Sequence, residues 1–215
     1  MSTFDHLRES IALKWFDCNA FMDKTKSPEG KGFLLNLHQK TPDAPLSPFY
    51  LNFRLLRSFP RVLADSARLF GSMLRNTTVS SSVYLADIPT AITPVVAVLS
   101  QQSGLPMITP RQPKTHGSGS SIDGVYLPGY EVALFDDVIT RADSKFDAID
   151  VLERHSLRVK HVFVFVDREQ GGASQLAEAG YELHAAWTIR ELLGFYLSQG
   201  KITSSMCDEI SDYLG

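Results

Sequence analysis

The chain has 215 residues, of which 44% are hydrophobic and 21% charged, and its formal net charge is -3. This composition is ordinary for a globular protein with one core, and the charge gives no reason to expect binding to nucleic acid or to a membrane. Its two cysteines, Cys18 and Cys207, fall in no paired spacing, which argues against a disulfide framework or a zinc site. The sequence has no cationic segment leading into an apolar leader and no apolar run of about 18 residues, so we expect a cytoplasmic protein.

The expected elements alternate between helix and strand, judged from hydrophobic periodicity and from the positions of proline and glycine. Helices are expected at residues 3–17, 60–74, 89–102, 144–155, 173–179, 188–198 and 203–213, and strands at 33–37, 49–53, 79–86, 105–109, 131–135 and 161–166. Parallel strands need crossover connections, which place helices on the faces of the sheet, so we expect an α/β fold with a mainly parallel sheet flanked by helices. We expect one domain over residues 1–215, with a small N-terminal hood built mainly from residues 1–58 and a core over residues 59–215.

The segment EVALFDDVITRADS, residues 131–144, carries the strongest chemical signal. An apolar strand ends in two adjacent carboxylates, Asp136 and Asp137, at the edge where open α/β sheets bind ligands. Thr140 and Ser144 add hydroxyl donors before a helix whose N-terminus favours an anion, and Ser144 can also cap that helix. This order suits a phosphorylated sugar, with the carboxylates on the ribose. The alternative is an acidic strand end followed by an ordinary helix cap.

Two further segments carry candidate site residues. HVFVFVDREQGG, residues 161–172, ends a buried strand in Asp167 and Arg168, and a guanidinium suits an acidic ligand because it forks onto a carboxylate. The alternative is a salt bridge between these two side chains. The second segment is RQPKTHGSGSSIDG, residues 111–124, which is too polar to be rigid. We interpret it as a lid that carries Lys114 and His116, and the alternative is a solvated surface loop. The remaining histidines show no two-ligand helical spacing, so each is expected at the surface or in the core.

These segments resemble the signatures of type I phosphoribosyltransferases, and among them most closely the orotate phosphoribosyltransferases. The paired acids, the DR-x-x-GG segment and the K-x-H-G lid carry the resemblance, together with SPFYLNFRLL at residues 47–56, which is similar to an SP-x-Y-x-x-x-R segment. The resemblance spans nearly the whole chain. It implies the type I phosphoribosyltransferase fold and transfer of the phosphoribosyl group of 5-phosphoribosyl-1-pyrophosphate (PRPP) to orotate, giving orotidine 5′-monophosphate and pyrophosphate.

The resemblance also implies roles for particular residues, which are as follows: Asp136 and Asp137 on the ribose, Thr140 and Ser144 on the 5′-phosphate, Arg111, Lys114 and His116 on the leaving pyrophosphate, and Arg168, Tyr50 and Asn36 on the side of the base. Asp137, Lys114 and His116 are the expected catalytic groups. Magnesium is implied as a cofactor that binds mainly through the pyrophosphate rather than through side chains. A homodimer is implied too, with the lid at residues 111–124 closing over the neighbouring subunit.

Several positions depart from the family pattern. Ala142 and Asp143 stand where the family has Gly after a small hydroxyl residue, and glycine would allow positive φ and a closer approach to phosphate. Pro110 replaces one cation of an Arg-Lys pair, a loss that typically costs about 1.5–3 kcal/mol of phosphate binding. Asn36 aligns with a lysine, and Asp87 with a glycine. Two alternatives therefore stay open: transfer to a different base, and a non-catalytic nucleotide-binding or regulatory relative.

Overall fold

The computed structural model describes residues 2–35, 38, 41–79, 83–111 and 121–215. Over these residues six strands form one sheet in the order β5-β4-β3-β6-β7-β8, in which only β5 runs antiparallel to its neighbour. The strands are β3 (Tyr84–Asp87), β4 (Met107–Pro110), β5 (Ile122–Asp123), β6 (Glu131–Ile139), β7 (Arg158–Asp167) and β8 (Glu182–Thr188). The mainly parallel sheet expected from the sequence is confirmed.

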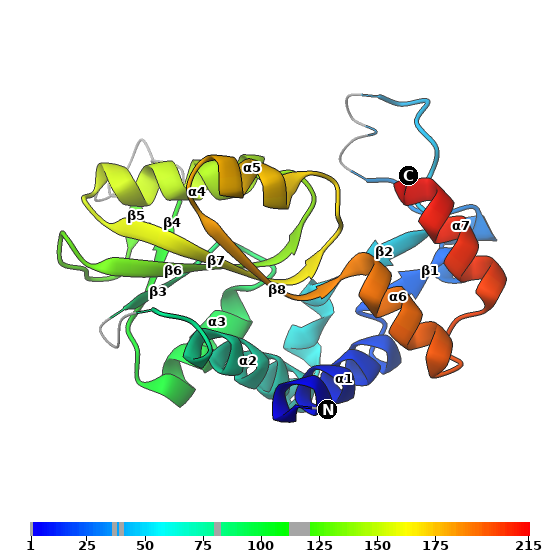
Figure 1. The fold of residues 1–215 in the computed structure, drawn as a ribbon, viewed down its shortest axis with the longest axis horizontal. Helices are drawn as coiled ribbons and strands as arrows, with labels where there is room; N and C mark the ends of the chain where they lie inside the picture. Colours follow the sequence, from blue (N-terminus) through cyan, green and yellow to red (C-terminus); the bar gives the residue numbers. More distant parts are fainter. Residues whose placement is uncertain (1, 36–37, 39–40, 80–82, 112–120) are drawn as a thin grey trace.

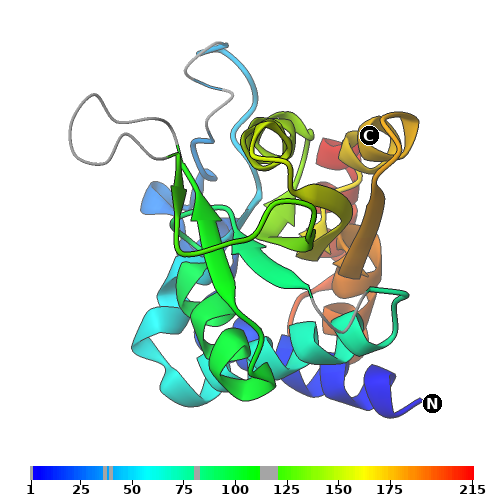
Figure 2. The same ribbon diagram turned by 90° about the vertical axis from the view of Figure 1, so that its left-hand side faces the viewer.

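Helices cover both faces of this sheet (Figure 1). The helices α2 (Pro60–Arg75) and α3 (Thr93–Ser103) lie on one face, and α4 (Asp143–Arg154) and α5 (Gly172–Glu178) lie on the other. Figure 2 shows the two helical layers on opposite sides of the strands. Successive strand residues point to opposite faces, so Phe135 joins the core on the α2 side while Leu134 joins the core on the α4 side.

The N-terminal hood has α1 (Thr3–Asp17), a two-stranded antiparallel sheet of β1 (Phe21–Asp23) and β2 (Phe49–Leu51), and the short 3₁₀ helices η1 (Lys24–Lys26), η2 (Pro28–Gly30) and η4 (Phe53–Ser58). The last two helices, α6 (Ile189–Ser198) and α7 (Ser204–Leu214), lie beside this small sheet (Figure 1). Of the strand expected at residues 33–37, residues 33–35 form no strand, and residues 36–37 lie outside the described ranges. Phe33 makes an isolated bridge to Ser47, and the partner of β2 is β1.

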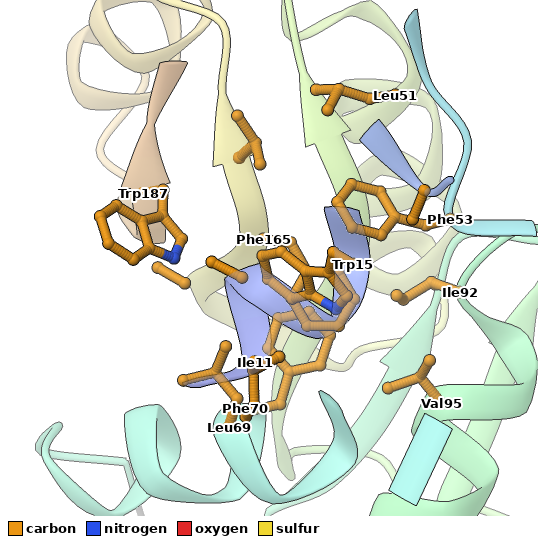
Figure 3. Packing of buried hydrophobic residues seen from close by; sticks show 14 of the residues in the cluster. Ile11, Trp15, Leu51, Phe53, Leu69, Phe70, Ile92, Val95, Phe165 and Trp187 are labelled. Carbon is orange, nitrogen blue, oxygen red and sulfur yellow. The ribbon is translucent and has the colours of Figure 1, made fainter. Parts of the chain in front are cut away.

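Aromatic packing around Trp15 fixes the hood to the sheet (Figure 3). The Trp15 ring lies 5.0 Å from the ring of Phe53 and 4.9 Å from that of Phe165, measured between centroids. Its indole N–H donates to the Ser66 hydroxyl at 2.9 Å, so the polar atom of this buried ring is satisfied. Phe70 on α2 stacks on Phe165 with centroids 4.1 Å apart. One aromatic cluster thus joins α1, η4, α2 and β7, and it holds the hood over the carboxyl ends of the strands.

Two expected boundaries were wrong near those carboxyl ends. The strand expected to stop at residue 135 runs on to Ile139, because Val138 and Ile139 continue the pairing with Val166 and Asp167 on β7. The helix expected to open at Pro89 begins at Thr93. Residues 88–92 form a turn between the end of β3 and that helix.

None of the helices in the described ranges is long and apolar enough to span a membrane.

Candidate active site

The loops at the carboxyl ends of β6 and β7 meet the hood around a cavity of about 500 Å³. Its lining includes Tyr50 and Arg54 from the hood, Thr140 and Arg141 after β6, and Arg168 after β7. The structure therefore brings together three of the residues singled out in the sequence, namely Tyr50, Thr140 and Arg168. Two cations of this lining, Arg54 and Arg141, favour a ligand with negative charge.

Asp136 and Asp137 lie inside β6 rather than beyond its end, so their side chains leave opposite faces of the strand. Asp136 is 7% exposed and accepts from the ammonium of Lys145 on α4 at 2.5 Å. Lys145 is itself 3% exposed and donates also to the carbonyl of Val138 at 2.7 Å. This buried ion pair pins α4 to β6 and fixes the orientation of Asp136. No sequence signal had indicated Lys145 as part of the site.

Asp137 lies on the other side of the strand, in the field of Arg54 from the hood. Burial and the neighbouring Asp136 raise the pKa of Asp137 to about 7, and the cations Lys145 and Arg54 oppose that rise. One of its oxygens accepts the N–H of Val138 at 2.9 Å. A carboxyl group whose pKa lies near 7 has both protonation states accessible at neutral pH. It can therefore exchange a proton or accept a hydrogen bond from a sugar hydroxyl.

The loop after β6 presents unpaired backbone donors. The N–H groups of Thr140, Arg141, Asp143 and Ser144 have no acceptor among the residues that the structure describes, while the N–H of Ala142 donates to the side-chain oxygen of Gln175 at 2.9 Å. These donors adjoin the start of α4, whose dipole favours an anion there. The arrangement can cradle a phosphate group.

The expected capping role of Ser144 was wrong. Ala142 occupies the N-cap position without any side-chain cap, and α4 begins at Asp143, so Ser144 lies in the first turn. Ala142 has φ of −88° and its side chain is buried in the core on the α4 side. This backbone needs no positive φ, so alanine fits the loop without strain.

Arg168 carries a buried charge that is only partly satisfied. It is 7% exposed, and its Nε and Nη2 have no hydrogen-bond partner among the described residues. Its guanidinium lies over the ring of Phe49, 4.4 Å from the centroid. Burial lowers the pKa of Arg168, and its neighbour Tyr213 on α7 opposes that change. An unpaired buried guanidinium facing a cavity calls for an anionic partner.

The salt bridge considered as an alternative for Asp167 and Arg168 is absent from the described part of the chain, because Asp167 accepts the N–H of Glu169 at 2.8 Å instead. Gly171 and Gly172 then turn the chain toward the loop after β6. A Cβ on Gly172 would lie 2.6 Å from the Ile139 side chain and 2.8 Å from the Thr140 carbonyl, which accepts the Gly172 N–H at 2.9 Å. Glycine is thus required for the two loops to touch.

A smaller cavity of about 220 Å³ has a lining that includes Arg111 and Ser144 together with Pro89 and Pro110. Arg111 is held by Asp123, with Nε 2.8 Å from the carboxylate oxygen. The structure thus separates the expected anion-binding residues into two groups. Thr140 and Arg168 line the larger cavity, and Arg111 and Ser144 line the smaller one.

Asp87 ends β3 close to this smaller cavity and is fully buried. It accepts hydrogen bonds from the hydroxyls of Thr93 and Thr109, and burial raises its pKa. These two hydroxyls compensate for the charge that replaces the glycine usual in the family pattern. Asn36, Lys114 and His116 lie outside the described residues. Arg54, Phe49 and Gln175 were not among the predicted site residues, and of these only Arg54 had a signal, its place in the SP-x-Y-x-x-x-R segment.

Comparisons with known proteins agree with this geometry. No protein-family model matches the chain. The orotate phosphoribosyltransferase of Thermoplasma acidophilum is 30% identical over 149 residues, which are 69% of this chain and 84% of the relative.

Solved structures of similar fold include Leishmania donovani UMP synthase, with a TM-score of 0.80 and 25% identity over 96% of this chain and 42% of that one. They also include Mycobacterium tuberculosis orotate phosphoribosyltransferase in complex with PRPP, with a TM-score of 0.62 and 18% identity over 86% of this chain and 98% of that one. At 18% identity, the likeness to the Mycobacterium tuberculosis protein shows the fold alone. The fold is that of the type I phosphoribosyltransferases, and the chain belongs to the orotate phosphoribosyltransferase family.

Proposed function

We propose that this protein transfers the phosphoribosyl group of PRPP to orotate, giving orotidine 5′-monophosphate and pyrophosphate for pyrimidine nucleotide synthesis. The observation that carries the proposal is the buried, unpaired guanidinium of Arg168 at the cavity of about 500 Å³. A carboxylate binds a guanidinium through two parallel hydrogen bonds, and orotate offers one on its ring. The free Nε and Nη2 of Arg168 are the pair of donors that such a fork needs.

The rest of the substrate is assigned to groups around the cavity. The N–H groups of Thr140, Arg141, Asp143 and Ser144, which have no acceptor among the described residues, suit the 5′-phosphate. Asp137 suits the ribose hydroxyls. The ion pair of Asp136 with Lys145 fixes the end of β6, the strand that carries Asp137. Tyr50 and Arg54 lie on the hood side of the base.

In the reaction the bond from C1 of the ribose to the pyrophosphate oxygen breaks, and N1 of orotate forms the new bond to C1 and loses its proton. Positive charge develops on the ribose ring and negative charge on the departing pyrophosphate. The carboxylate of Asp137 stabilises the ring, and Arg111 with the proposed lid groups Lys114 and His116 stabilises the pyrophosphate. A closed lid would exclude water and strengthen each of these interactions.

Magnesium would neutralise part of the pyrophosphate charge when bound. The carboxylates present fit such an ion only in part, because Asp136 is already engaged by Lys145 at 2.5 Å. The ion would therefore be coordinated mainly by substrate oxygens and water.

A homodimer, in which the lid of one subunit closes over the other, and a cytoplasmic location complete the proposal. Sedimentation of the free protein tests the dimer, and activity after metal chelation tests the magnesium requirement.

The proposal is tested by steady-state consumption of orotate with PRPP and magnesium. Arg168→Ala should raise the KM for orotate about 10- to 100-fold, since a hydrogen-bonded charge is worth about 1.5–3 kcal/mol. The matched control is Arg158→Ala, at the exposed opposite end of the same strand, which should leave KM unchanged. Background turnover by the folded wild-type protein would reject the proposal.

One observation favours a non-catalytic relative as the second candidate. The N–H of Ala142 is occupied by Gln175, and Asp143 adds negative charge to the same loop. Both features weaken a phosphate site. Calorimetric titration with PRPP, and with nucleoside monophosphates, separates the candidates, because a regulator would bind a nucleotide without any turnover. Transfer to another base, suggested by Asn36, is tested by a panel of purines and pyrimidines in the same assay.

A further inference from the structure

A second cluster of chemically active side chains lies at the amino ends of β7 and β8, at the opposite end of the sheet from the candidate active site. His161 is the fourth residue of β7, and Glu182 and His184 are the first and third residues of β8. The parallel register places His161 opposite Glu182 and Phe163 opposite His184. Because alternate residues share a face of a sheet, all three side chains leave the sheet on one side.

The three ligand atoms lie within coordination reach of one another. Nδ1 of His161 is 3.0 Å from Nε2 of His184 and 3.4 Å from Oε2 of Glu182, and the latter two atoms are 4.0 Å apart. A tetrahedral metal bound at about 2.0–2.2 Å separates its ligand atoms by about 3.3–3.6 Å. The cluster therefore needs shifts of only a few tenths of an ångström to surround one ion.

The surroundings of His161 orient it for this purpose. Its other nitrogen, Nε2, is buried without a hydrogen-bond partner among the described residues, and the carboxylate of Glu131 lies 4.0 Å away. A proton on Nε2, facing Glu131, leaves the lone pair of Nδ1 directed at the cluster. Metal-binding histidines characteristically hydrogen-bond a carboxylate through their second nitrogen, and Glu131 would have to move closer than 4.0 Å to make that bond here.

The position of Glu182 also suits a cation. Lys160 holds the other oxygen of Glu182 at 3.0 Å, which leaves Oε2 toward the histidines. The Glu182 side chain is 50% exposed, so an ion can enter from solvent and keep water as its fourth ligand.

We infer that His161, Glu182 and His184 form a site for a divalent transition metal, with zinc as the expected occupant, which ties the edge strand β8 to β7. Two imidazoles and one carboxylate are the donor set of zinc, nickel and copper, whereas magnesium prefers oxygen ligands and near-octahedral geometry. This site is therefore separate, in place and in ligand chemistry, from the magnesium proposed for the reaction. The alternative is a hydrogen bond between two neutral imidazoles with no metal affinity.

The test is calorimetric titration of the untagged, chelator-stripped full-length protein with zinc chloride, without magnesium or PRPP. Wild-type protein should bind one zinc ion per chain with micromolar affinity or better. His184→Ala should weaken binding at least about 100-fold, and Glu131→Gln about 10- to 100-fold. The matched control is His6→Ala, an exposed histidine on α1, which should bind zinc as wild type does.

Cobalt provides a readout that a structural role would not give. Wild-type protein with cobalt chloride should show the visible absorption of a tetrahedral ion, and zinc should remove it while millimolar magnesium should not. His184→Ala should lack this absorption although its circular dichroism matches wild type. The inference is overturned if wild-type protein binds no stoichiometric zinc, if His184→Ala binds zinc as tightly as wild type, or if magnesium displaces the cobalt.

Discussion

The polar side chains at the two ends of strand β7 differ in whether they have partners. At the carboxyl end Arg168 is buried beside a cavity with two of its nitrogens unpaired, so this end is built for something that the described chain does not supply. At the amino end His161 and His184 already contact each other at 3.0 Å, and Glu182 is nearby. The difference teaches that a site for a large substrate needs an open cavity with unpaired donors. The proposed ion site needs only that a few ligand atoms lie close together. Variants that disturb one end and spare the other sharpen this comparison.

The largest expected effect comes from the buried ion pair at the carboxyl end. Lys145→Ala leaves Asp136 buried without its cation, which should lower the free energy of unfolding by about 3–5 kcal/mol. Chemical denaturation of purified protein measures this. The control is Lys201→Ala, which removes a partly exposed pair with Asp17 at 2.8 Å and should cost no more than about 1 kcal/mol. Equal effects for the two variants would contradict the assigned role of Lys145.

A smaller loss is expected where the two loops touch. Gly172→Ala forces a methyl group against Ile139 and the Thr140 carbonyl, so stability should fall by about 1–3 kcal/mol and the KM for PRPP should rise. Thermal unfolding and the orotate assay report the two effects. Gly194→Ala in α6, where an added Cβ meets nothing within 4 Å, is the control and should be neutral or slightly stabilising. If Gly172→Ala matches that control, the contact between the loops does not position the site.

Replacing Arg168 should raise the stability of the protein and lower its activity. Arg168→Met removes a buried charge that no carboxylate pairs among the described residues, so the ligand-free protein should gain about 1 kcal/mol in stability while the KM for orotate rises as in Arg168→Ala. Denaturant melts without substrate, together with the steady-state assay, test both parts. A clear loss of stability in the ligand-free variant would mean that stacking on Phe49 outweighs the burial of the charge.

A pH dependence of stability is expected from Asp137. Its pKa is raised from 3.8 to about 7 in the folded protein, so between about pH 4 and pH 7 the folded state binds more protons than the unfolded state. The free energy of unfolding therefore falls as pH rises through this window, and Asp137→Asn should flatten that part of the profile. Thermal melts of both proteins from pH 4 to pH 8 provide the measurement. Parallel profiles would place the titration on another group.

The same ionisation should appear in catalysis. If the carboxylate of Asp137 holds the ribose, kcat/KM for PRPP should fall as pH drops below about 7, because the free enzyme then carries the protonated acid. A profile that stays level from pH 6 to pH 8 would exclude the ionised form of Asp137 as the group that binds the sugar.

Much of the fold followed from the sequence because its signals are local. Apolar runs such as residues 161–166 indicated the strands, and the helices expected at residues 3–17 and 188–198 are found as α1 and α6, each of which opens with a capping box. The extent of β6 did not follow, because two charged residues inside a strand read as its end. The burial of Asp136 depends on Lys145, nine residues along the chain, and on the neighbouring strands.

The candidate sites divide in the same way. Arg168 and the glycine pair after it lie within one contiguous motif, so sequence alone indicated them. His161 and His184 are 23 residues apart on different strands and meet only through the register of β7 with β8. A search for helical ligand spacing could not find them. The hydrogen bond from the Ala142 N–H was missed for a related reason, since its acceptor Gln175 lies on α5.

The neighbour of Arg168 on α7 has a consequence for protein engineering. Tyr213 is a hydrogen-bonding neighbour of the guanidinium, yet it belongs to a helix outside the central sheet and outside the loops that would hold the sugar. Tyr213→Phe would therefore remove a contact that orients Arg168 while the phosphate cradle and the paired acids stay as they are. Helix α7 thus offers a way to change the surroundings of Arg168 without a substitution in those loops.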